Sequence, residues 1–233
     1  MKSVEVYTNL KSLLKEKGLS VSVGDEGGFA PNLKTSEEVL DLIILSIERA
    51  GLIYLDDMSI ALDCAASELF SEDSYKLTGE NKKFSSDEMV FYMQALVDKY
   101  EIKSVEDPFD EKDWDAWKTF TKNNNDLQIV GDDIFVTQEK ILRKGIDSKV
   151  ANSILVKLNQ VGTLSETMQA ISLAKNSGYK TIISHRSGET EDSFIADLAV
   201  AVDAGQIKTG APARSDRTAK YNLLLLIEDE LYP

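Results

Sequence analysis

The chain has 233 residues, of which 42% are apolar and 28% charged, an ordinary composition for a globular protein that can bury a sizeable core. Its 40 acidic residues outnumber 26 basic residues and give a formal net charge of −14, which argues against nucleic acid and anionic membrane surfaces as main partners. A single cysteine excludes an internal disulfide. Because the sequence also has no signal-peptide run and no apolar stretch of about 18 residues, we expect a cytoplasmic protein without a membrane span.

Short apolar runs alternate with longer helical patterns along the chain. Two helical segments come first, at 4–17 and 36–50, and the second opens on a capping-box pair, Thr35 and Glu38. Gly51 and Gly178 stand where helices are expected to end. From there strands and helices alternate, which predicts parallel strands joined by right-handed crossovers. The expected strands are 59–63, 103–106, 128–132, 153–157, 180–184 and 206–209, and the expected later helices are 85–100, 113–122, 138–145, 164–176, 191–202 and 214–231.

Only six strands are evident, whereas a complete eight-stranded α/β barrel takes about 250 residues. Either the sheet is open or the chain is a barrel from which strands are missing. No internal repeat and no Pro/Gly-rich boundary divides the chain, so we expect one domain over residues 1–233.

Charged residues follow the six expected strands at the point where each strand ends. Because the carboxyl ends of parallel strands lie on one face of a barrel, where active sites are built, we expect these side chains to share a site. Any one of them alone would more often be a cap or a solvated residue, but six charged strand ends in succession are not expected by chance. Carboxylates without Cys or His suit Mg2+, and lysines at the next strand ends suit a base and an anion clamp. The residues are Asp63, Glu106, Asp107, Asp132, Asp133, Lys157, His185, Arg186 and Lys208.

Seven segments in order resemble the enolase family and cover nearly the whole chain. The resemblance implies an α/β fold, namely an incomplete TIM-type (β/α) barrel of the enolase C-terminal domain with about six parallel strands. It also implies that the family's N-terminal domain and first barrel strands are absent. The segments are VGDEGGFAPN (23–32), ALDCAASE (61–68), SVEDPFDEKDW (104–114), QIVGDDIFVT (128–137), LVKLNQVGTLSE (155–166), SHRSGETEDSFIADLAV (184–200) and GQIKTGAPARSDRTAKYN (205–222).

The resemblance further implies Mg2+-dependent dehydration of 2-phospho-D-glycerate to phosphoenolpyruvate in glycolysis, and the reverse reaction in gluconeogenesis. Lys157 matches the family's base and Glu26 its acid. Asp63, Glu106 and Asp132 match the Mg2+ ligands, and the last two also count among the substrate-binding residues. The complete protein is expected to form a homodimer or a higher homo-oligomer. The remaining expected substrate-binding residues are Ser184, His185, Arg186, Ser187 and Lys208.

Glu26 must hold a proton when the substrate hydroxyl departs, so we expect its surroundings to raise its pKa. In a Gly-rich loop, however, the same residue can be only part of a turn. Asp107 and Asp133 stand next to the expected ligands, and we expect them to act as supporting partners or caps.

Two other functions stay open on the sequence alone. One is a non-catalytic remnant, or one part of a split enolase, that acts as a binding protein; the missing N-terminal part favours it, and the full set of charged residues argues against it. The other is a related carboxylate-processing lyase on the same barrel, which the segments at 184–192 and 205–212 disfavour.

Overall fold

The computed structural model describes residues 2–232, and the chain divides into two compact units. Unit 2 is the continuous segment Ser59–Thr181. Unit 1 runs up to Met58 and resumes at Ile182, so it is built from two separate stretches of the sequence.

Unit 2 contains four short strands that pair in parallel in the order β1, β5, β6, β7. All four strands expected in this part of the sequence are confirmed, as are its four longer helices; the single-turn helix α6 was not expected. The strands are β1 (Ala61–Asp63), β5 (Ser104–Glu106), β6 (Gln128–Gly131) and β7 (Ser153–Val156), and the helices are α3 (Ser86–Tyr100), α4 (Trp114–Asn123), α5 (Glu139–Ser148), α6 (Leu158–Val161) and α7 (Leu164–Asn176).

The core of unit 2 joins the strands to aromatic side chains of α4 and the loop before it. Val105, Ile129 and Ile154 on three neighbouring strands are fully buried, as strands covered on both faces require. The ring of Phe109 packs edge-on against those of Trp117 and Phe120, at centroid distances of 6.1 and 5.4 Å. Such aromatic pairs add to the stability of the apolar burial itself.

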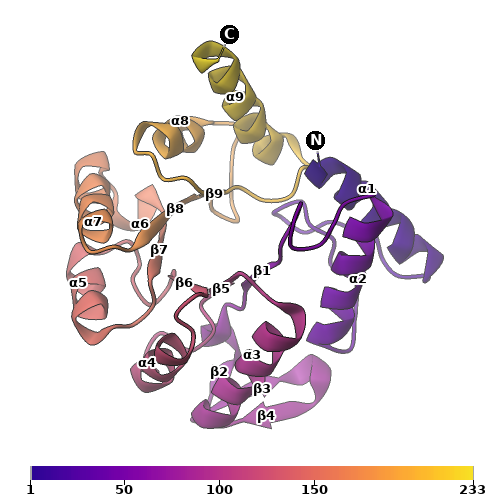
Figure 1. Ribbon diagram of the computed structural model, residues 1–233, viewed down its shortest axis with the longest axis horizontal. Helices are drawn as coiled ribbons and strands as arrows, with labels where there is room; N and C mark the ends of the chain where they lie inside the picture. The colour runs from indigo at the N-terminus through magenta and orange to yellow at the C-terminus, as the bar shows by residue number, and fades with distance from the viewer. Residues whose placement is uncertain (1, 233) are drawn as a thin grey trace. The chain divides into compact units, whose positions relative to one another are not determined.

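An antiparallel sheet of three short strands lies between β1 and α3 in the sequence and was not expected. Its first turn has positive φ at Glu72 and Asp73, a conformation for which Asn or Gly is the usual signal. Figure 1 shows this sheet beside α3. Its strands are β2 (Phe70–Ser71), β3 (Ser74–Leu77) and β4 (Lys82–Phe84); the 3-10 turn η1 (Ala66–Leu69) precedes β2, and the 3-10 turn η2 (Thr78–Glu80) connects β3 to β4.

The N-terminal half of unit 1 is a pair of packed helices, α1 (Lys2–Glu16) and α2 (Ser36–Arg49), which lie side by side in Figure 1. The expected cap is confirmed in part: Thr35 Oγ1 accepts from the N–H of Glu38, while the Glu38 carboxylate accepts from Lys34 instead of Thr35. Gly51 follows α2 with φ 74°, the left-handed conformation that ends a helix, as expected.

The other half of unit 1 follows β8 (Lys180–Ser184), a strand that begins in unit 2 and ends in unit 1. Strand β8 pairs in parallel with β9 (Ile207–Lys208), which confirms the last two expected strands. Helix α8 (Phe194–Ala201) is shorter than expected, because the side chains of Thr190 and Asp192 accept from backbone N–H groups two residues ahead and hold this segment out of the helix. Helix α9 (Ser215–Leu231) follows.

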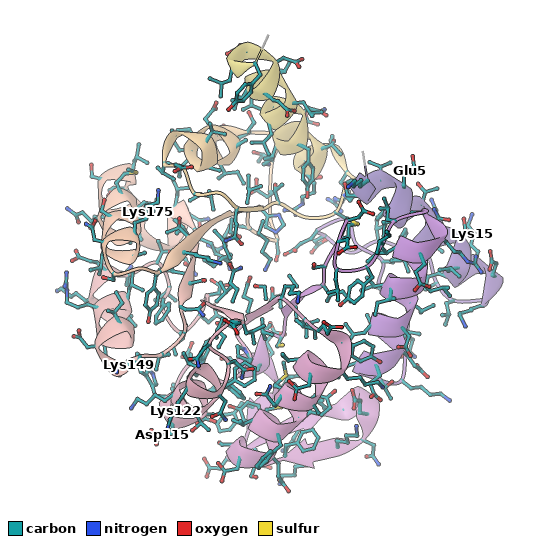
Figure 2. All side chains as sticks on the ribbon, viewed as in Figure 1. Glu5, Lys15, Asp115, Lys122, Lys149 and Lys175 are labelled. Carbon is teal, nitrogen blue, oxygen red and sulfur yellow. The ribbon has the colours of Figure 1, made fainter. Side chains whose placement is uncertain are left out.

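Many charged side chains on the helices or at their ends face solvent in both units. Figure 2 labels six such residues, all exposed. Among residues 2–232, no helix combines the length and the apolar character needed to cross a membrane. The labelled residues are Glu5, Lys15, Asp115, Lys122, Lys149 and Lys175.

Candidate active site

The three expected Mg2+ ligands follow neighbouring parallel strands of unit 2. Asp63, at the end of β1, pairs in register with Glu106 at the end of β5. Glu106 in turn pairs with Val130 of β6, two residues before Asp132. Register therefore brings the backbones that carry all three carboxylates to one edge of the strands.

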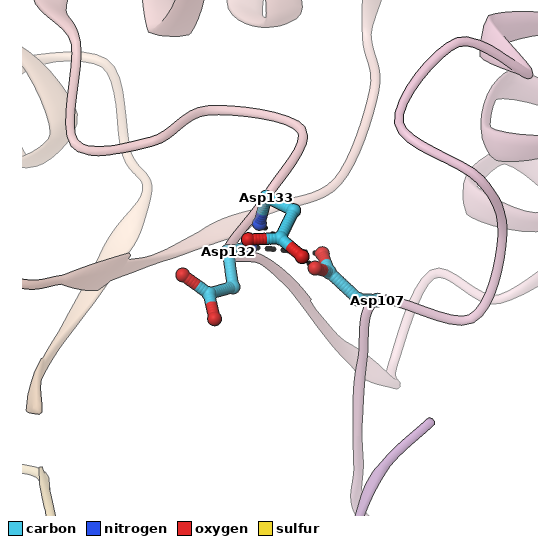
Figure 3. Close-up of side chains that lie close together, drawn as sticks. All are labelled: Asp107, Asp132 and Asp133. Carbon is cyan, nitrogen blue, oxygen red and sulfur yellow. Dashed lines mark hydrogen bonds between the residues drawn. The ribbon is translucent and has the colours of Figure 1, made fainter. Parts of the chain in front are cut away.

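A second group of carboxylates overlaps this set at Asp132 alone. One oxygen each of Asp107, Asp132 and Asp133 lies within 4.8 Å of the others. Asp107 accepts the backbone N–H groups of Asp132 and Asp133 at 2.9 and 2.8 Å, the bonds that are dashed in Figure 3. Asp107 thus caps the turn that carries Asp132, the supporting role that was expected for it.

Burial of Asp107 raises the pKa of its carboxyl group to about 8, against the two hydrogen bonds that lower it. The neighbouring charges of Asp132 and Asp133 also act to raise the pKa, and the value of about 8 includes their effect. In Figure 3 the carboxylates of Asp107 and Asp133 turn toward each other, and that of Asp132 is directed away. Asp132 is thereby left to make contacts on its other side.

Lys157 supplies the cation that meets Asp132. It stands directly after β7, and its Nζ contacts Asp132 Oδ2 in an ion pair in which the side chains are 16% and 11% exposed. The backbone N–H of Lys157 donates to Thr137 Oγ1 at 3.0 Å, and Thr137 Oγ1 bonds to the side chain of Gln160 at 2.7 Å. The expected base and one expected metal ligand are therefore direct neighbours.

In unit 1 the loop that carries Glu26 is fixed by backbone bonds. Gly24 and Gly28 close a tight turn with an N–H to carbonyl distance of 2.8 Å, and the Glu26 carbonyl accepts from the N–H of Ala211 at 2.9 Å. Gly27 has φ 82°, and a Cβ there would lie 2.7 Å from the carbonyl oxygen of Ala213. Only glycine fits this position without strain.

The carboxylate of Glu26 faces two of the expected substrate-binding residues. Ser187 Oγ donates to Glu26 Oε1 at 3.0 Å, and His185 Nε2 lies 3.3 Å from Glu26 Oε2. The neighbouring His185 imidazole lowers the pKa of Glu26 well below its usual range. Partial burial acts in the opposite direction, whereas Ser187 and Lys208 lower the pKa as well. The expectation of a raised pKa was therefore wrong for this state of the protein: the imidazole of His185 beside one carboxylate oxygen and the hydroxyl of Ser187 bonded to the other favour the ionised form.

The side chain of His185 is buried, at 2% exposure. Its second ring nitrogen, Nδ1, contacts Arg217. Arg217 Nη1 lies 2.5 Å from His185 Nδ1. The guanidinium also donates to the carbonyl oxygens of Arg186, Ser187 and Asp25, at 2.7, 2.7 and 2.9 Å. One side chain of α9 thus ties the Glu26 loop to the 185–187 segment.

Arg217 and Lys220 are two residues that the sequence did not single out. Both are fully buried on the first turns of α9. Lys220 Nζ bonds to Glu189 Oε2 at 2.9 Å and to the carbonyl oxygens of Thr190 and Asp216. Two cations three residues apart at a helix start, beside a charged strand end, were the available signal, because that spacing puts both on one helix face.

The remaining expected substrate-binding residues lie near this cluster in unit 1. Ser184 of β8 is in register with Lys208 of β9, and the His185 N–H donates to the Lys208 carbonyl at 2.9 Å. Ser184 is 3% exposed, and its hydroxyl donates to the His185 carbonyl at 2.9 Å. The backbone N–H of Arg186 donates to Glu189 at 3.0 Å.

The alternation of strands and helices, with parallel pairing and charged residues at the strand ends, defines an α/β protein with a site at the carboxyl ends of its strands. Residues 1–232 match the family model described as "Enolase, C-terminal TIM barrel domain". The chain is 56% identical over 230 residues to the protein named "Enolase" of Natranaerobius thermophilus, an alignment that covers 98% of this chain. The chain therefore belongs to the enolase family, with the incomplete TIM-type barrel expected from its sequence. It spans about half the length of that relative, 54%.

Proposed function

We propose that this chain provides the barrel part of an enzyme that dehydrates 2-phospho-D-glycerate to phosphoenolpyruvate in glycolysis, and that residues 1–233 belong to one barrel domain. The observation that carries the proposal is the contact between Lys157 and Asp132, at the ends of the adjacent parallel strands β7 and β6. A lysine and a carboxylate at neighbouring strand ends supply a base and an oxygen ligand for the same reaction. Cytoplasmic location and a homodimer or higher homo-oligomer form part of the proposal.

The chemistry of the donor set fits Mg2+. Asp63, Glu106 and Asp132 offer only carboxylate oxygens and follow strands that are in register, and hard oxygen donors are what Mg2+ prefers. These three residues would hold the ion. When bound, it would stabilise the negative charge that builds up on the substrate carboxylate as the C2 proton leaves.

Lys157, once it has given up the proton that makes it the cation of its pair with Asp132, would take the C2 proton onto the free amine of Nζ, and the electron pair of the broken C–H bond would form the C2–C3 double bond. The C3–O bond breaks as this double bond forms, and Glu26 would protonate the departing hydroxyl, which leaves as water. Asp132 keeps Lys157 Nζ at its position through the ion pair, and the bond from Thr137 to the Lys157 N–H fixes the backbone beneath it.

The ionised state of Glu26 suits the reverse reaction directly, because a carboxylate accepts a proton from the attacking water. In the forward direction the acid needs a proton first. An arriving substrate with phosphate and carboxylate groups adds negative charge, which raises the pKa of a nearby carboxyl group. Arg186 and Lys208 would bind these anionic groups, since a guanidinium and an ammonium both suit phosphate and carboxylate oxygens.

A turnover assay tests the proposal. The purified 233-residue chain is mixed with Mg2+ and 2-phosphoglycerate, and formation of the enolpyruvate product is followed by its ultraviolet absorbance. We expect turnover in the wild-type chain and its loss in Lys157→Ala. The matched control is Lys180→Ala, which removes an exposed lysine at the start of β8 and should keep activity.

A folded chain without turnover would favour the second candidate, a barrel part that is inactive alone or serves as a binding protein. The coverage of only 54% of the relative is the observation in favour of this candidate. Adding the N-terminal part of that relative as a separate polypeptide distinguishes two versions of this second candidate, a split enzyme and an inactive remnant. Recovered turnover would identify one part of a split enzyme, whereas continued inactivity would favour a remnant.

A further inference from the structure

His185 has two ring nitrogens in two opposite environments. It is the single histidine of the chain, and its side chain is 2% exposed. On one side Nδ1 lies 2.5 Å from Arg217 Nη1. On the other side Nε2 lies 3.3 Å from Glu26 Oε2. An imidazole placed between a guanidinium and a carboxylate can take only one arrangement of protons that satisfies both neighbours.

The guanidinium decides the state of Nδ1. An arginine side chain donates hydrogen bonds, accepts none and stays charged in proteins. All four hydrogens on the two terminal nitrogens of Arg217 are in use, because Nη1 bonds to His185 and the Arg186 carbonyl and Nη2 bonds to the carbonyls of Asp25 and Ser187. The group therefore cannot turn away, and Nδ1 must present its lone pair.

We propose that Arg217 is a positioning residue that fixes His185 as the neutral tautomer with its hydrogen on Nε2, so that the ring acts as a hydrogen-bond donor beside Glu26. With Nδ1 accepting from Arg217, the ring proton has only Nε2 to occupy. Protonation of both nitrogens would place an N–H against the N–H of Arg217 and a second positive charge beside the guanidinium.

The charges around the ring favour the same state. Arg217 faces Nδ1, and its Nε lies 3.2 Å from Asp216 Oδ2, so the guanidinium keeps a carboxylate on its far side. Lys208 is joined to His185 through the backbone and acts on Glu26 as a further positive charge. Glu26 is the group that attracts a proton to Nε2, and the Nε2–H tautomer supplies that proton without adding net charge to the ring.

Nε2 lacks a hydrogen-bond partner among the described residues. Glu26 Oε2 lies 3.3 Å away, yet within residues 2–232 the buried Nε2 is in no hydrogen bond. A buried donor left unpaired is costly, so a ligand oxygen that reaches it gains a bond that the free protein lacks. This part of the inference rests on the proposed function: the oxygen would be the C3 hydroxyl of the substrate, which Nε2–H would orient toward Glu26.

Nitrogen NMR of the wild-type chain without substrate tests the tautomer directly. Because the chain has one histidine, long-range proton–nitrogen correlations of the 15N-labelled protein contain a single imidazole. At pH 7 we expect a protonated signature for Nε2 and an unprotonated signature for Nδ1. A ring protonated at Nδ1, or at both nitrogens, would overturn the proposal, whatever the outcome of the turnover assay.

Variants then test whether Arg217 is the cause. Glutamine at this position can accept as well as donate, so Arg217→Gln should release Nδ1 and give a mixture of tautomers. Arg217→Lys, which only donates, should keep the hydrogen on Nε2. The matched control is Arg214→Gln, which removes an exposed arginine near the start of α9 that pairs with Asp216, and it should leave the imidazole signals unchanged.

If a folded Arg217→Gln chain kept the wild-type tautomer, another group would determine the tautomer of His185. The same conclusion would follow if a folded Arg217→Lys chain carried the ring hydrogen on Nδ1. Circular dichroism checks folding before the spectra are compared. If Arg217→Gln does not fold, the wild-type spectrum and the lysine variant still decide the question. A chain with the expected tautomer and no turnover would reject the proposed function alone.

Discussion

The polar clusters of the two units are built in opposite ways. In unit 2 carboxylates are in excess, and they are held by backbone N–H groups and by one lysine: Asp107 accepts two N–H groups, and Asp132 pairs with Lys157. In unit 1 buried cations are prominent, and they are held mainly by carbonyl oxygens, three for Arg217 and two for Lys220.

The difference shows which contacts each cluster depends on. The unit 2 residues stand at the ends of paired strands, so register alone brings their backbones together. The unit 1 residues come from loops that are far apart in the sequence, and one guanidinium joins them. Removing a charge from unit 2 should therefore act mainly on chemistry, and removing one from unit 1 should act mainly on folding and positioning.

The largest effect is expected from Lys157→Ala. Loss of the proposed base should lower kcat by about 10²–10⁴-fold, the usual contribution of a positioned acid or base. Steady-state kinetics measures the change, with Lys180→Ala as the control that keeps kcat. A Lys157→Ala chain with more than about a tenth of wild-type kcat would show that another group removes the proton, since such a loss is far below the expected range.

Arg217→Met should lower the free energy of unfolding by about 3–5 kcal/mol, because three carbonyl oxygens and one ring nitrogen lose their donor. Urea titration followed by circular dichroism measures it. The control Arg214→Met removes a partly exposed pair with Asp216 and should cost no more than about 1 kcal/mol. Equal losses in the two variants would mean that the buried network contributes nothing of its own.

Gly27→Ala should destabilise the chain by about 1–3 kcal/mol, since φ 82° and the carbonyl of Ala213 both oppose a Cβ. Its neighbour Gly28 has no atom within 4 Å of a built Cβ and no left-handed φ, so Gly28→Ala is a matched control. That variant should change stability by about 0.5 kcal/mol or less. The same urea titration compares them, and a reversed order would contradict the strain argument.

The smallest effect concerns pH. Burial raises the pKa of Glu189, but Lys220 and the N–H of Arg186 outweigh it, and the net pKa is lowered. A carboxyl with a depressed folded pKa stabilises the protein above its unfolded pKa of about 4.3, and this contribution is lost as the pH falls further. Urea midpoints at pH 7 and pH 3.5 should therefore differ less in Glu189→Gln than in wild type. The exposed Glu191→Gln is the control, and an unchanged difference in Glu189→Gln would reject the assignment.

The sequence predicted the strands and helices of this chain that have a regular hydrophobic pattern. All six strands of the alternation were expected, because buried parallel strands give short apolar runs and each is followed by a charge. The three-stranded sheet at residues 70–84 was missed, since its strands are only two to four residues long and its first turn uses Glu72 and Asp73 where Gly or Asn would be the signal.

For the candidate site, the sequence likewise predicted the residues at strand ends but not the contacts between distant side chains. Lys157 and Asp132 were expected from strand ends, and they are neighbours. The depressed pKa of Glu26 and the role of Arg217 were missed. Both depend on side chains that meet across more than 30 residues of sequence, at angles that no local pattern fixes. Periodicity reports which face a residue takes on its own helix or strand, but not which distant group it meets there.

Unit 1 has a consequence for the order of folding, because the sequence of unit 2 is inserted in the middle of it. Helices α1 and α2 are synthesised first, but the contacts of Asp25 and Glu26 with Arg217 and Ser187 span 192 and 161 residues. Such long loops close slowly. On the ribosome the continuous segment Ser59–Thr181 can complete its own core first, and the Glu26 loop must wait for α9 to emerge before it takes its final conformation.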